Sequence, residues 1–271
     1  MTSRPIPRAF WVAPVIVVAV AIFGMVVVHT RVFSWENGVS TWLTERRFPV
    51  LSEVALAIAI GFSPLWAVVL TLITATILTV AAGGTWTRRA LVALRFLSLV
   101  LAGWAAAAIV KPIVARPRPG RGVIVHPIAP ETGTLSFPSG HTAFAAGFFF
   151  ALVVTVVSLE RRTAALVIAA LLVIVVASSR VHVGAHFVTD VTAGAIAGAT
   201  GVWLAHRAWG FAAPGRYTLD YRPRHQLTAE PREHTAPRED TESIGTAHQV
   251  DTLPGTPRAL PQSFSIDTSG E

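Results

Sequence analysis

Apolar runs separated by short polar intervals dominate the first 211 residues of the chain. Six of these runs approach the roughly 20 residues that a helix needs to cross a membrane. They occupy residues 10–28, 64–82, 90–110, 139–159, 163–177 and 187–205. The pattern predicts an all-α, polytopic membrane protein in which six transmembrane helices form a bundle.

Two segments between the first and second runs follow a different pattern. Residues 31–47 are polar and carry Trp35 and Trp42, which is typical of a segment at a membrane surface. Residues 50–62 are apolar but interrupted by Glu53. We therefore expect an interfacial helical segment here, lying on the bilayer or dipping into it, rather than a further crossing.

Composition agrees with a membrane protein and divides the chain into three parts. Of its 271 residues, 52% are hydrophobic and 14% are charged, and the mean hydropathy is +0.57. Residues 1–9 form a short N-terminal tail, residues 10–211 the membrane domain, and residues 212–271 a segment rich in Pro, Thr, Arg and Glu. Such a segment buries too little apolar surface to fold, so we expect it to be disordered. The chain has no cysteine, which excludes disulfides and thiolate metal sites.

The net charge of +7 is unevenly distributed along the chain. Residues 1–211 carry sixteen Lys and Arg against six Asp and Glu. If six helices alternate, one side collects Arg4, Arg8, Arg88, Arg89, Arg161, Arg162 and Arg207. Basic loops stay inside, so this side and both termini are predicted to be cytoplasmic, although a smaller group of arginines opposes this orientation. Nucleic-acid binding is disfavoured, because the cations are scattered between the apolar runs.

With this topology, three polar segments share the outer face. The first is residues 111–138, which begin KPIVARPRP; the second is PSGH at residues 138–141; the third is SRVHVGAHFVTD at residues 179–190. His186 and Asp190 are four residues apart, so on a helix they share one face, where the carboxylate can fix the imidazole tautomer. Asp190 is also the only aspartate before residue 212.

The side chains of these three segments suit a phosphate group. The cations are Lys111, which is the only lysine, Arg118 and Arg180; the neutral donors are Ser139 and the Gly140 amide; the histidines are His141 and His186. A helix that begins here with Ser139 as its N-cap would turn N–H groups and a favourable dipole toward the phosphate. The sequence has no carboxylate cluster or zinc motif, but a small metal site made of His141, His186 and Asp190 stays open as an alternative.

Together the three segments resemble the signature of the type 2 phosphatidic acid phosphatase superfamily, abbreviated PAP2. Its pattern of K-x6-RP, PSGH and SR-x5-H-x3-D is filled at every fixed position. The resemblance implies that His186 attacks phosphorus, that Asp190 orients His186, and that His141 protonates the leaving group and later activates water. It also implies that no metal or other cofactor is needed and that the phosphate is held by Lys111, Arg118, Ser139, Gly140 and Arg180.

The function implied by this resemblance is hydrolysis of a lipid phosphate within the bilayer by a metal-independent phosphatase. The substrate would be a phosphomonoester or pyrophosphate such as undecaprenyl pyrophosphate, phosphatidic acid or phosphatidylglycerol phosphate, and the motif does not choose among them. Two alternatives stay open. One is a phosphotransferase that uses the same phosphohistidine, and the other is a non-catalytic binder or transporter of anionic lipid.

Other polar or small residues near these segments are weaker candidates for function. His182 occupies a variable position of the third segment and is expected to pack at the rim of the site. Arg116 and Arg121 could steer an anionic headgroup or be solvated loop charges. Gly194 and Gly198 have the GxxxG spacing that indicates close helix packing rather than function.

Overall fold

The computed structural model describes residues 9–120, 123, 128 and 133–212. These residues form eight α-helices and no strand. The helices are α1 (Ala9–His29), α2 (Trp35–Glu45), α3 (Pro49–Gly61), α4 (Pro64–Ala81), α5 (Trp86–Val114), α6 (Gly140–Val156), α7 (Leu159–His182) and α8 (Val188–Ala212). The all-α prediction is confirmed for the described residues, whereas the predicted disordered tail lies outside them.

Five of the described helices, α1, α4, α5, α7 and α8, are long and apolar enough to cross a membrane. Helix α6 is also apolar but has 17 residues. At 1.5 Å per residue it spans about 26 Å, slightly less than the roughly 30 Å hydrocarbon core. A multi-pass membrane protein is therefore confirmed, while the sixth crossing stays a prediction.

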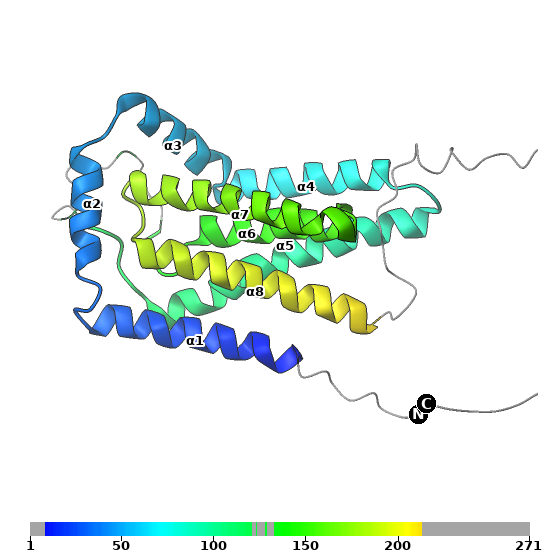
Figure 1. Cartoon of the computed structure of the whole chain (residues 1–271), viewed down its shortest axis with the longest axis horizontal. Helices are drawn as coiled ribbons and strands as arrows, with labels where there is room; N and C mark the ends of the chain where they lie inside the picture. The colour runs from blue at the N-terminus through cyan, green and yellow to red at the C-terminus, as the bar shows by residue number, and fades with distance from the viewer. Residues whose placement is uncertain (1–8, 121–122, 124–127, 129–132, 213–271) are drawn as a thin grey trace, which may run out of the picture. The chain divides into compact units, whose positions relative to one another are not determined.

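Helix α2 lies across one end of the helix bundle, and α3 leads from there to the start of α4 (Figure 1). We call this end, where α1, α5 and α7 finish and α6 and α8 begin, the α2 end. Helix α2 exposes Trp35 and Trp42 and buries Glu36, Ser40 and Thr44. It thus has the placement expected of an interfacial helix, but its polar side faces the protein.

Helices α5, α6 and α8 pack against one another, with α7 on α6, α1 on α5 and α8, and α4 on α5. Two glycines of α8 permit this close approach. A Cβ at Gly194 would lie 2.5 Å from the carbonyl oxygen of Ser139, and a Cβ at Gly198 would lie 2.5 Å from that of Ala143. Neither position has room for a side chain, so the interpretation of GxxxG as a packing motif is confirmed. The contact at Gly194 sets α8 against the residue that caps α6.

At the α2 end, two helices extend further than the polarity of their sequences predicts. Helix α5 continues past Lys111, which lies in its last turn instead of opening the loop. Helix α7 likewise continues past Arg180, which was expected in a turn. Each of these helices is followed by a residue with left-handed backbone, which is Ala115 (φ 50°) after α5 and Gly184 (φ 79°) after α7. A polar residue at the end of an apolar run can still be helical. The left-handed backbone, and not the first polar residue, therefore marks where α5 and α7 end.

Candidate active site

Three segments that are distant in sequence meet at the α2 end: the residues after α5, the start of α6, and the connection from α7 to α8. The Ser139 N–H donates to the carbonyl oxygen of Asp190 at 2.9 Å, and the Ser136 N–H donates to that of Arg116 at 2.7 Å. An isolated antiparallel bridge pairs Pro117 with Leu135. These backbone contacts bring the three polar segments of the sequence to one place.

His186 and Asp190 are both buried at this junction. Nδ1 of His186 lies 3.5 Å from Oδ2 of Asp190, an electrostatic contact that is long for a hydrogen bond. On the other side of the ring, Nε2 lies 3.2 Å from Nη1 of Arg118. A guanidinium can only donate, so Nε2 accepts and the ring proton resides on Nδ1, facing the carboxylate. This tautomer presents the Nε2 lone pair for chemistry.

Burial determines the protonation state of His186. It lowers the pKa of the imidazole to about 4, because a charged ring would lose its hydration there. The contact with Asp190 opposes this shift, and the positive charges of Arg118 and Arg180 add to it. His186 is therefore neutral at physiological pH, as a nitrogen nucleophile must be.

Backbone carbonyls hold two of the predicted phosphate-binding cations beside the histidine. Arg118 donates from Nε to the carbonyl oxygen of Gly133 and from Nη1 to that of Ala185, both at 2.8 Å. Lys111 donates from Nζ to the carbonyl oxygen of Leu135 at 3.2 Å. Both positive groups thus have a defined position at the α2 end.

The first turn of α6 supplies the second histidine. Ser139 caps the helix as predicted, since its Oγ accepts from the Thr142 N–H at 3.5 Å and from the Thr142 hydroxyl at 3.1 Å. Gly140 is the first residue of the helix and His141 the second. The positive end of the helix dipole therefore lies beside His141, where it favours an anion.

His141 and Arg180 complete the predicted set. His141 is close enough to Arg118, Arg180 and His186 to interact electrostatically with all three. Arg180 comes from the last turn of α7 and is almost fully buried. The structure thus gathers every predicted site residue at the α2 end. These residues come from α5 and the segment that follows it, the start of α6, the end of α7, the connection between α7 and α8, and α8.

A buried ion-pair network adjoins Asp190 and was not predicted. Arg116 donates from Nη1 to Oδ1 of Asp190 at 2.7 Å and from Nη2 to Oε2 of Glu36 at 3.0 Å. Glu36 also accepts from the N–H of Thr189 at 2.6 Å and from its hydroxyl at 3.0 Å. The interpretation of Arg116 as a headgroup-steering or solvated charge is wrong. Only 11% of its side chain is exposed, and it is paired with two carboxylates that are fully buried. Arg121 lies outside the described residues.

One sequence signal could have identified Glu36. Glu36, Ser40 and Thr44 are spaced by four residues, so a helix places them on one face. Trp35 and Trp42 lie on other faces and are exposed. A polar stripe on a helix at the membrane surface, opposite its tryptophans, indicates a polar protein surface beneath the helix.

His182 has a structural partner, which agrees with its interpretation as a packing residue at the rim. Its Nε2 lies 3.0 Å from Oγ of Ser52, and this contact links α7 to α3. Within the described ranges, no three His, Cys, Asp or Glu side chains converge as a metal ion would require. The alternative metal site of His141, His186 and Asp190 therefore gains no support from the geometry.

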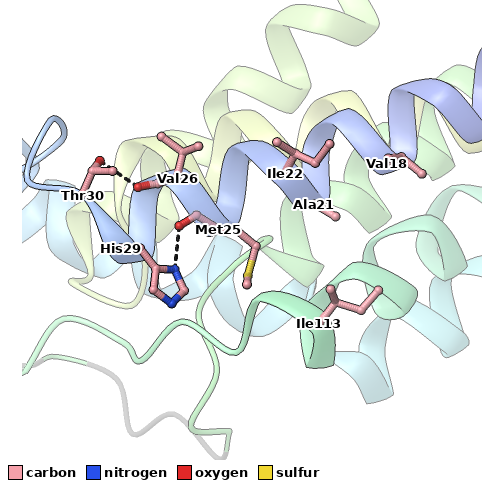
Figure 2. Close-up of a pocket in the computed structure, with 8 residues that line it drawn as sticks. All are labelled: Val18, Ala21, Ile22, Met25, Val26, His29, Thr30 and Ile113. Carbon is pink, nitrogen blue, oxygen red and sulfur yellow. Dashed lines mark hydrogen bonds between the residues drawn. The ribbon is translucent and has the colours of Figure 1, made fainter.

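Apolar grooves open between the helices. One, of about 660 Å³, lies among α2, α3, α7 and α8 and reaches His182 and Val188 at the edge of the site. Another, of about 480 Å³, lies between α1 and the end of α5 (Figure 2). There Ile113 lies opposite side chains of α1, and Nδ1 of His29 donates to the carbonyl oxygen of Met25 at 2.9 Å. The first groove adjoins the candidate site, whereas none of the predicted site residues lines the second.

A family model described as the PAP2 superfamily matches residues 64–213, which include α4 to α8 and all three polar segments. A solved structure, that of the first transmembrane PAP2 type phosphatidylglycerolphosphate phosphatase from Bacillus subtilis, matches with a TM-score of 0.61 and 24% identity. The match covers 75% of this chain and 99% of that one, and at this identity it shows a shared fold. No curated protein matches the chain.

Proposed function

Because the chain belongs to the PAP2 superfamily, we propose that it is a membrane phosphatase that hydrolyses a phosphomonoester or pyrophosphate of a bilayer lipid. The observation that carries the proposal is the buried, neutral His186, with Nδ1 facing Asp190 and Nε2 facing Arg118. A nucleophilic nitrogen next to a guanidinium suits phosphoryl transfer through a covalent intermediate.

In the first half-reaction, Nε2 of His186 attacks phosphorus, and the bond between phosphorus and the leaving oxygen breaks. A phosphohistidine forms, and His141 gives the departing oxygen its proton. The ring of His186 becomes positively charged, because Nδ1 keeps its proton. Asp190, 3.5 Å from Nδ1, stabilises that charge as it develops.

In the second half-reaction, water attacks the phosphohistidine. His141, now neutral, takes a proton from that water as the bond between phosphorus and Nε2 breaks. Inorganic phosphate leaves, and His186 returns to its neutral form. A histidine that acts in turn as acid and base contributes about 10²- to 10⁴-fold to the rate, and neither step calls for a metal ion.

The phosphate oxygens gain charge during both steps and need donors. In this proposal the donors are Lys111, Arg118, Arg180, Ser139 and the N–H of Gly140. Nη1 of Arg118 lies 3.2 Å from Nε2, where phosphorus must approach, so we expect the guanidinium to move onto the phosphate oxygens when substrate binds. Removal of one such donor typically costs about 3–4 kcal/mol of transition-state stabilisation.

The lipid part of the substrate would lie in the bilayer, and the groove of about 660 Å³ supports this because its apolar walls end beside the site at His182 and Val188. Undecaprenyl pyrophosphate, phosphatidic acid and phosphatidylglycerol phosphate all fit such a site, and the similar Bacillus subtilis protein is named for the last of these. We place the site on the outer face and both termini in the cytoplasm. The start of α1 and the end of α8 lie at the end of the bundle opposite α2, which is consistent with this orientation (Figure 1).

The test is phosphate release by the purified protein from a panel of these lipid phosphates, with EDTA present throughout. We expect turnover by the native protein and its loss in His186→Ala. Turnover by His186→Ala at the native rate would refute the phosphohistidine mechanism. Activity that disappears in EDTA and returns with a divalent cation would refute metal independence.

A further inference from the structure

Glu36 and Arg116 lie directly behind the His186–Asp190 pair. We propose that both are positioning residues for the reaction: Arg116 holds Asp190 so that the ring proton of His186 stays on Nδ1, and Glu36 holds Arg116. This inference rests on the proposed function and extends the site to α2, which precedes the region matched by the family model. It gives a role to a buried acid that the mechanism above does not use.

Arg116 is fixed on several sides. Besides its bonds to Asp190 and Glu36, Nη1 donates to Oγ1 of Thr189 at 2.8 Å. The centre of the guanidinium lies 4.1 Å from the ring centroid of Phe187, a cation–π contact. The Phe187 N–H in turn donates to Oδ2 of Asp190 at 2.9 Å. Asp190 thus has one oxygen bound by Arg116 and the other held between Phe187 and His186, so its carboxylate cannot rotate without breaking a bond.

Glu36 anchors this arrangement from a different helix. Its carboxylate accepts from the N–H of Thr189, the second residue of α8, at 2.6 Å. The first N–H groups of a helix have no partner within it, so Glu36 caps α8 from α2. Because Asp190 is the next residue along α8, Glu36 fixes both the turn that carries Asp190 and the guanidinium that binds it.

Electrostatics separates the two roles. Two buried carboxylates, Glu36 and Asp190, share one guanidinium. Loss of Arg116 removes a positive charge near His186 and leaves the two acids to repel each other. When Glu36 loses its negative charge, the positive charge of Arg116 is balanced by Asp190 alone. The two changes therefore act on the protonation of His186 in opposite directions.

Other charged groups also face His186, and they stay in place in these variants. They come from every element packed around it: Asp190 of α8, Arg180 of α7, His141 of α6 and Arg118 of the segment after α5. A change of protonation that appears on substitution of Glu36 or Arg116 would therefore be transmitted through Arg116 and Asp190. A network that served only to attach α2 to the bundle would lower stability and leave the protonation of His186 as it is.

The experiment compares the full chain with Arg116→Met, Glu36→Gln and Arg116→Lys. Glu45→Gln is the matched control, because Glu45 lies in α2 but is exposed. The readouts are kcat and KM for phosphate release and the acidic limb of kcat/KM against pH, which reports the unliganded enzyme. We expect Arg116→Met to lower kcat about 10- to 100-fold, the usual range for a residue that orients a functional side chain, with a smaller change in KM.

The direction of the acidic limb is the sharper prediction. The limb should move to higher pH in Arg116→Met, because a positive charge near His186 is lost. It should move to lower pH in Glu36→Gln, because a negative charge is lost. In Arg116→Lys, which keeps the positive charge, it should stay close to its native position. Glu45→Gln should match the native protein. If Arg116→Met and Glu36→Gln keep the native limb while their melting temperatures fall, the network is only structural and the proposal is overturned.

A second readout does not depend on turnover. Nitrogen-15 NMR of histidine-labelled protein reports which ring nitrogen carries the proton, with the His186 signal identified by its absence in His186→Gln. The native protein should show Nδ1–H at His186, and Arg116→Met should shift the proton toward Nε2. An unchanged tautomer in Arg116→Met and Glu36→Gln would overturn the positioning role. If the native protein released no phosphate from any lipid, the proposed function would fail, and the NMR result would still decide this inference.

Discussion

Gly194 is the residue at which helix packing and the candidate site depend most directly on each other. It sets α8 against the backbone of Ser139, and the Ser139 N–H bonds the carbonyl oxygen of Asp190 at 2.9 Å. The substitution Gly194→Ala would put a methyl group 2.5 Å from the Ser139 carbonyl oxygen. We predict that this single methyl group lowers activity more than it lowers stability.

The magnitude follows from the available space. Real Cβ contacts essentially never fall below 3.0 Å, so α8 and the PSGH segment must separate by about 0.5 Å. Overpacking of this kind costs about 1–3 kcal/mol, and the better helix propensity of alanine returns about 1 kcal/mol. The net loss of stability is then about 0–2 kcal/mol. Since a misplacement of 1 Å at a reacting centre costs about 10²-fold in rate, we expect kcat to fall about 10-fold.

The assay is lipid-phosphate turnover measured beside thermal unfolding in detergent. Gly210→Ala is the control, because Gly210 lies in the same helix and an added Cβ there meets nothing within 4 Å. Gly198→Ala is a second comparison, since its methyl group would meet Ala143 rather than Ser139. The reasoning is refuted if Gly194→Ala keeps native kcat and melts no lower than Gly210→Ala.

Three further predictions concern protonation, orientation and the link between α3 and α7. The lowered pKa of His186, about 4, predicts that kcat/KM holds down to about pH 4 and falls below it. The unfolded chain binds this proton first, near pH 6.5, so stability to unfolding should decrease by about 3 kcal/mol between pH 6.5 and 4; an acidic limb near 6.5 would contradict the burial argument. A cysteine introduced at Gly133 should react with an impermeant reagent in intact cells, and labelling only after lysis would invert the orientation. Ser52→Ala removes the contact with His182 at 3.0 Å, so it should lower stability by about 1 kcal/mol and leave kcat unchanged; a large loss of kcat would give His182 a role in the reaction.

Local sequence patterns predicted the described helices and selected residues that the structure brings together at the α2 end. Apolar runs indicated the described helices other than α2, which a polar segment with two tryptophans indicated. A serine ahead of an apolar run correctly marked the N-cap of α6. Polarity predicts the wrong helix ends near Lys111 and Arg180, because α5 and α7 continue past these residues. The actual ends depend on left-handed backbone at Ala115 and Gly184. An alanine in that conformation has no local sequence signature, because a residue other than glycine rarely adopts a positive φ.

The network around Asp190 could not be predicted in the same way. Glu36 and Thr189 are 153 residues apart in sequence, so no local pattern connects them. Helical spacing showed that Glu36 shares a face with Ser40 and Thr44. It could not show which part of the protein that face meets, because the transverse position of α2 follows from packing and not from periodicity. A buried carboxylate needs a cation nearby, but the sequence offers several arginines as candidates.

Arg116 and Arg118 lie two residues apart in KPIVARPRP and have different partners around His186. Each arginine precedes a proline, and the residue before a proline is restricted to extended backbone. In an extended segment, side chains two residues apart lie on the same side of the chain, so both arginines can reach the surroundings of His186. Arg116 reaches Asp190, on the Nδ1 side of His186, whereas Arg118 reaches Nε2. The two arginines therefore lie on opposite sides of one imidazole, Arg116 behind the carboxylate that faces Nδ1 and Arg118 beside Nε2. One supports the carboxylate that fixes the tautomer, and the other lies where the proposed phosphate would bind.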